Sequence, residues 1–84
     1  MRCHVRLEDG RPTSLVESWR ENTRAAQYGH ETLCRSETGL WVLERAADWQ
    51  GSPTTWEEVA AWRAAAWLAL NAHAIPEGLH EQIV

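Results

Sequence analysis

The sequence predicts a small α+β domain in which an antiparallel β-hairpin packs against an N-terminal helix and a C-terminal helix rich in tryptophan and alanine. Residues 31–45, ETLCRSETGLWVLER, contain two β-like runs joined by a turn that ends in glycine. A helix-capping pattern precedes residues 15–27, and tryptophans recur at helical spacing within residues 54–71. A chain of 84 residues has room for one core, so we expect a single domain over residues 1–84.

The N-terminal segment is expected to form a short strand and then a helix. Residues 3–7, CHVRL, alternate between polar and apolar side chains before the turn signal Asp9-Gly10. Ser14 is a suitable helix cap, and Glu17 lies three residues further on, where it can act as the reciprocal capping partner. The pattern therefore predicts a helix over about residues 15–27.

The hairpin has a predicted register. A three-residue loop, Glu37-Thr38-Gly39, with glycine in the left-handed conformation indicates a type I turn followed by a glycine bulge. The loop pairs Ser36 with Leu40, Arg35 with Trp41, Cys34 with Val42, Leu33 with Leu43, Thr32 with Glu44 and Glu31 with Arg45. These pairs are chemically compatible, and they include a cation beside an aromatic ring and an ion pair at the open end.

Strand alternation divides the hairpin into two faces. The face with Leu33, Trp41 and Leu43 is the better core candidate. The face with Cys34 and Val42 is too apolar to remain in water, so we expect a helix or a partner to cover part of it.

Residues 54–71 are expected to form one helix, because Thr55 and Glu58 have capping-box spacing. At about 100° per residue, the predicted core face consists of Trp56, Val59, Ala60, Trp62, Ala66, Trp67 and Leu70. The opposite face consists of Ala61, Ala64, Ala65, Leu68 and Ala69. It carries little charge, so either the C-terminal tail covers it or it docks onto another chain.

An alternative places a third strand over residues 54–59 and starts the helix near Ala60 or Ala61. The helical spacing of Trp56 and Val59 argues against it, whereas a resemblance argues for it. The run ETLCRSETGLWVLER, followed by AAAWL and Asn71, resembles a pattern in small uncharacterised bacterial and phage-associated proteins. In them, ETLY-R-[ST], a glycine turn and W-x-L precede a capped helix with A-x-x-W-L. The resemblance covers residues 28–79, and it implies the third strand but no activity or functional residue. These proteins often have a serine or proline cap where this chain has Ala60-Ala61.

The candidate metal ligands are Cys3, His4, His30 and Cys34. On a strand, His30 and Cys34 would lie roughly 13 Å apart, too far to share an ion or to act as base and nucleophile. No nucleophile elbow, phosphate loop or metalloprotease motif is present in the sequence. We therefore predict no metal, no cofactor, no catalytic residue and no enzyme activity.

Charge and hydropathy narrow the possible partners. Twelve acidic residues outnumber eight arginines, giving a net charge of −4, and there is no basic run, so direct nucleic-acid binding is not expected. No signal-like start and no apolar run of roughly 20 residues is present, which predicts a cytoplasmic protein without a membrane segment. In that reducing compartment, both cysteines are expected to be free thiols.

We therefore expect a non-enzymatic protein-binding module. Its most concrete form is a phage or mobile-element inhibitor of a host system, such as an anti-CRISPR protein, that occupies a surface of its partner. Trp49 lies in a connector, where it either packs onto the core or serves as an exposed anchor. The predicted partner contacts are Trp49, Ala61, Ala65 and Leu68. The alternatives are a structural or regulatory homodimer, or an antitoxin-like partner, and, third, a small enzyme.

Overall fold

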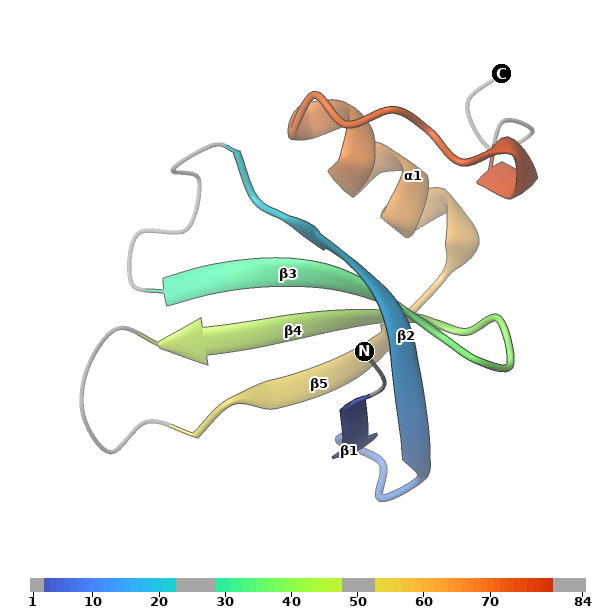
Figure 1. Cartoon of the computed structure of the whole chain (residues 1–84). Coiled ribbons are helices and arrows are strands. Elements are labelled where there is room, and N and C mark those ends of the chain that lie inside the picture. Colours follow the sequence, from blue (N-terminus) through green and yellow to red (C-terminus); the bar gives the residue numbers. More distant parts are fainter. Residues whose placement is uncertain (1–2, 23–28, 48–52, 80–84) are drawn as a thin grey trace.

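The computed structural model describes residues 3–22, 29–47 and 53–79 (Figure 1). This part of the chain forms one five-stranded antiparallel sheet and one α-helix. The strands lie side by side in chain order: β1 (Cys3–Arg6), β2 (Pro12–Arg20), β3 (Gly29–Ser36), β4 (Trp41–Ala47) and β5 (Thr55–Val59). The helix α1 (Ala61–Leu70) follows β5 and packs against the sheet. The domain is mostly β, so the predicted α+β class with an N-terminal helix is wrong.

Residues 12–20 form β2, so the helix predicted over residues 15–27 is wrong for the residues that are described. Both edges of β2 are paired, with β1 on one side and β3 on the other, and these neighbours satisfy its backbone groups. The Ser14 hydroxyl hydrogen-bonds His4 across the strands instead of capping a helix. A bulge between Leu15 and Glu17 shifts the register toward β3. Long-range pairing therefore outweighs the local capping signal.

The β3–β4 hairpin confirms the predicted register from Arg35 opposite Trp41 to Glu31 opposite Arg45. Gly39 has a φ of 92°, the left-handed conformation that the loop requires. The Ser36 N–H donates to the Leu40 carbonyl at 2.9 Å, which closes the turn.

The alternative with a further strand is confirmed, because residues 55–59 form β5 along the free edge of β4. The Trp56 indole N–H donates to Glu44 on β4 at 2.9 Å. Ala60 is extended and offers no side-chain cap, and α1 begins at the next residue. The single helix predicted over residues 54–71 is therefore wrong in its first part.

Both faces of the sheet are packed. The buried cluster between α1 and the sheet consists of Leu33, Trp41, Leu43, Val59, Ala64, Ala65, Leu68 and Leu79. On the other face, they are Leu7, Leu15, Cys34 and Val42. The chain's own N-terminal strands therefore cover the face for which a helix or a partner was expected.

The sheet curls until the chain after β1 reaches β5. The Glu8 N–H donates to the Trp56 carbonyl at 2.8 Å. The Arg11 guanidinium also pairs with the Glu58 carboxylate beside this point. These two contacts link the turn after β1 to the edge strand β5, but β1 and β5 are not hydrogen-bonded neighbours in the sheet.

The helix is turned relative to its predicted orientation. Ala64, Ala65 and Leu68 face the core, whereas Trp62 and Leu70 are 63% and 75% exposed. The reason is that the helix begins later than predicted. Because Trp56 and Val59 belong to β5, they do not contribute to the apolar face of α1. Small alanines let the helix approach the sheet closely.

Candidate functional site

The outer face of α1 is an apolar stripe on the surface of the domain. Trp62, Ala66 and Leu70 follow one another at four-residue intervals and are all exposed, so they share one side of the helix. Ala69 is also exposed beside Leu70. We call these four residues the outer stripe.

The neighbouring Trp67 belongs to the fold, in contrast to Trp62. Its indole N–H donates to the Glu31 carboxylate at 3.3 Å, and its ring stacks on His73 with the centroids 5.9 Å apart. Trp67 is half-buried against the core. Trp62 leaves most of its indole in water, so burial within the domain does not explain a tryptophan at this position.

Charged groups lie at one border of the outer stripe. Arg63 is the one charged residue between Ala61 and Leu70, and its guanidinium lies 3.6 Å from the Glu57 carboxylate. Glu57 also accepts a hydrogen bond from Arg45 at 3.0 Å, and Arg45 pairs with Glu31 at 3.3 Å. Burial alone would lower the pKa of Arg45, but its bonds to these two carboxylates raise the pKa overall. Ion pairs thus connect Arg63 on α1 with Glu57 on β5, and continue through Arg45 on β4 to Glu31 on β3.

Two of the predicted partner contacts, Ala65 and Leu68, lie inside the fold. Trp49 lies outside the described residues. Ala61 is half-buried and packs against the core. Ala65 is 1% exposed and Leu68 is fully buried, because this helix face packs on the sheet and Leu79 joins it from the C-terminal tail. Neither the C-terminal tail alone nor another chain covers this face: the sheet provides most of the contacts, and Leu79 and Ile75 add to them.

The outer stripe was missed because Trp62 and Leu70 were assigned to the core. Capping signals could not have revealed it, because Thr55 is a good capping residue whereas Ala60, at the true start, offers no side-chain cap. The one signal that favoured the later start was the resemblance, which implied a strand over residues 54–59. Starting the helix at Ala61 turns the stripe outward.

The candidate metal ligands do not form one cluster, although Cys3 and Cys34 line the same surface pocket. His30 pairs with the Glu21 carboxylate at 3.1 Å, whereas Cys34 is buried and its thiol points to the Thr32 carbonyl at 3.8 Å. Among the described residues, no cluster of three or more His, Cys, Asp or Glu side chains could hold a metal ion. Cys3 and Cys34 are both free thiols, as predicted.

Comparison with family models, with curated proteins and with solved structures finds no match for this chain. Within the described ranges, no helix has the length and apolar character needed to cross a membrane. The resemblance to small phage-associated proteins stays a prediction.

Proposed function

We propose that this chain is a protein-binding module that inserts the outer stripe of α1 into an apolar groove of a partner protein. The observation that carries the proposal is the exposure of Trp62 and Leu70 on the same side of one helix. Single exposed apolar side chains are common, but two large ones joined by exposed alanines form a continuous surface. An amphipathic helix that places anchors at four-residue intervals is a recurrent way of filling a groove.

The chemistry of the stripe defines the chemistry of the partner. Tryptophan is among the residues that contribute most at protein interfaces, because it buries a large apolar ring. The small side chains of Ala66 and Ala69 allow close approach between the two anchors. No acidic residue occurs between Ala61 and Leu70, so the groove requires no basic lining. We infer an uncharged groove with one pocket for an indole and another for a leucine.

Two kinds of partner fit this proposal. In the first, the groove belongs to a different protein, and inhibition of a host complex is then one form of the activity. In the second, it belongs to another copy of this chain, as in a regulatory homodimer. We place the heterologous partner first because in a two-fold homodimer the stripe would meet its own copy, helix against helix, and would not enter a groove.

Photocrosslinking from the stripe tests the proposal. The photoreactive residue p-benzoyl-phenylalanine replaces Trp62 in cells that carry the gene, and irradiation traps the protein in contact with it. We expect one discrete adduct heavier than a dimer of the chain, which is lost when Leu70→Asp is introduced into the same protein. The matched control places the photoreactive residue at the exposed Glu8, in the turn after β1.

Two results would overturn the proposal: no adduct from position 62, or equal adducts from positions 62 and 8. An adduct of twice the chain mass would show that the partner is a second copy of this chain and not a different protein. Circular dichroism of each variant shows that the fold is retained, as expected for substitutions at exposed positions.

A further inference from the structure

Cys3 and Cys34 line one surface pocket, although β2 lies between their strands. The pocket has a volume of about 410 Å³, and we call it the thiol pocket. Cys3 is exposed, whereas Cys34 is 3% exposed and belongs to a buried cluster. The pKa of the Cys34 thiol is raised first by burial and then by Glu44 and Cys3, so the two thiols are near enough to interact electrostatically.

Both thiols lie on the concave face of the curled sheet. The buried cluster on this face includes Leu15, Cys34 and Val42, and Val5 of β1 and Trp56 of β5 pack against it. Because side chains from both edge strands meet this one cluster, this face is the inside of the curl. Cys3 pairs with Leu15 across the ladder and lies two residues before Val5, so it shares the face. The side chains of Cys3 and Cys34 therefore converge.

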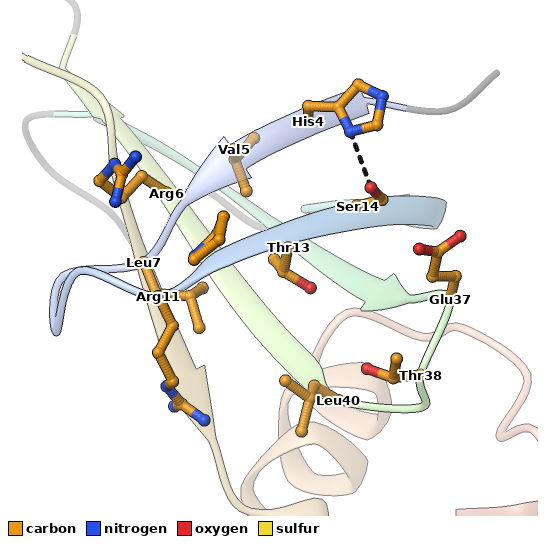
Figure 2. Close-up of a pocket in the computed structure, with 11 residues that line it drawn as sticks. His4, Val5, Arg6, Leu7, Arg11, Thr13, Ser14, Glu37, Thr38 and Leu40 are labelled. Atoms are coloured by element: carbon orange, nitrogen blue, oxygen red, sulfur yellow. Dashed lines mark hydrogen bonds between the residues drawn. The ribbon is translucent and has the colours of Figure 1, made fainter.

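The thiols have few other metal-binding groups beside them. Among the described residues, no three His, Cys, Asp or Glu side chains form a metal-binding cluster. His4 lies on the other side of β1, where it lines a separate cavity and its Nδ1 is 2.7 Å from the Ser14 hydroxyl oxygen (Figure 2). Glu44 lines the thiol pocket, but its carboxylate accepts a hydrogen bond from the Trp56 indole at 2.9 Å. The donor set is therefore two sulfurs.

The strand spacing is too wide for a direct disulfide. Neighbouring strands are about 4.8 Å apart, so the backbones of β1 and β3 are separated by roughly 10 Å, whereas a disulfide joins Cα atoms less than about 7 Å apart. A bridge through a metal ion reaches further, because two metal–sulfur bonds of roughly 2.3 Å each replace one sulfur–sulfur bond of about 2 Å. The convergence of the two side chains on the concave face shortens the remaining gap.

We propose that Cys3 and Cys34 bind one Cu(I) ion between them as two thiolate ligands. Thiolates are soft ligands that select Cu(I), and this ion is stable with two sulfurs, whereas structural zinc sites use four ligands. Binding displaces both thiol protons to the buffer, and no electron is transferred. The resulting complex carries one negative charge. Arg20 lines the pocket with a positive charge, but Glu17 and Glu44 add negative charge, so the copper–sulfur bonds must supply the affinity.

An anaerobic titration with Cu(I), in competition with the chelator bicinchoninate, tests this site. We expect one copper ion per chain without a change in oligomeric state, and two sulfur neighbours in X-ray absorption at the copper edge. Cys3→Ser alters an exposed residue and should weaken Cu(I) binding about 100-fold or more, because two linked ligands bind far more tightly than one. Cys34→Ala should have the same effect. Zn(II) should bind much more weakly than Cu(I), because the pocket lacks four ligands.

His4→Ala is the matched control, because His4 is a metal-binding side chain next to Cys3 that lines a different cavity. It should leave the affinity for Cu(I) unchanged. A loss in His4→Ala as large as that in Cys34→Ala would show that Cys3 binds the ion without Cys34. That result, one copper ion shared by two chains, or equal affinities of Cys3→Ser and the unmodified protein would overturn the proposal. The helix α1 packs on the opposite face of the sheet, so the copper site and the proposed protein partner are tested separately.

Discussion

Asn22 and Asn71 bind each other through two hydrogen bonds that connect the end of β2 to the end of α1. The Asn22 N–H donates to the Asn71 side-chain oxygen at 2.8 Å, and the Asn22 side-chain amide donates to the Asn71 carbonyl at 2.8 Å. The Asn71 amide also donates to the Trp67 carbonyl at 2.9 Å in the last turn of the helix. Asn71 is 4% exposed, so it replaces water as the partner of backbone groups at a buried helix end.

Asn71→Ala should therefore lower the free energy of unfolding by about 2 kcal/mol or more, because it leaves the Asn22 N–H and the Trp67 carbonyl without these partners. Asn22→Ala is the matched comparison. It removes one hydrogen bond from an exposed residue and keeps its backbone N–H, so it should cost only about 1 kcal/mol. Urea denaturation followed by circular dichroism measures both values. Equal losses would show that the buried side chain of Asn71 has no special role.

The β3–β4 hairpin could be predicted because its information is local. The loop that ends at Gly39 fixes the register, and every cross-strand pair from Arg35–Trp41 to Glu31–Arg45 follows from it. The strand β2 could not be found in the same way. The sequence has a capping pattern at Ser14 and Glu17, but β2 pairs instead with β1 across a short turn and with β3, whose residues are more distant in the chain.

The outer stripe of α1 could not be predicted, because its sequence is ambiguous in a similar way. Trp56 and Val59 are three residues apart, which suits a helix, and only the pairing with β4 makes them part of a strand. Including them moved the predicted core arc of the helix onto Trp62 and Leu70 and away from Ala65 and Leu68. An error in the helix start thus exchanged its inner and outer faces.

Arginine substitutions at two adjacent residues of α1 should distinguish its buried face from its exposed face. Ala65→Arg places a charge among buried apolar side chains and should cost several kcal/mol, roughly 3 or more, in unfolding free energy. Ala66→Arg lies on the outer stripe, and arginine is a good helix former, so its effect should stay within about 0.5 kcal/mol. Thermal melts with light scattering give stability and mass together. If Ala65→Arg left the stability unchanged and abolished self-association, the face that contains Ala65 would be an interface and not part of the core.

Gly39→Val tests the turn that sets the hairpin register. A Cβ atom at this position would meet no atom within 4 Å, so the cost arises from backbone conformation rather than from a clash. A β-branched residue rarely adopts a φ of 92°, and we expect a loss of about 1 kcal/mol or more. Gly78→Ala is the control: its Cβ also has open space, and Gly78 has no left-handed φ. A loss at Gly78 equal to that at Gly39 would contradict the argument from conformation.

The two thiols should differ sharply in reactivity. Burial raises the pKa of the Cys34 thiol from 9.0 to about 12, with smaller contributions from Glu44 and Cys3, whereas Cys3 is exposed. Iodoacetamide reacts with the thiolate, so near pH 8 the folded protein should gain one adduct, at Cys3, and the denatured protein two. Intact mass and peptide mapping identify the modified residue.

The same shift links Cys34 to stability at high pH. Because its pKa is higher in the folded state, the thiol favours folding below pH 9, and this contribution is lost as the pH rises toward about 12. The unfolded chain releases the proton first, so the free energy of unfolding should fall over this interval more steeply than in Cys34→Ala. Urea denaturation at a series of pH values measures the difference. An identical pH dependence in the two proteins, or rapid labelling of Cys34 in the folded state, would show that this thiol is not held neutral by burial.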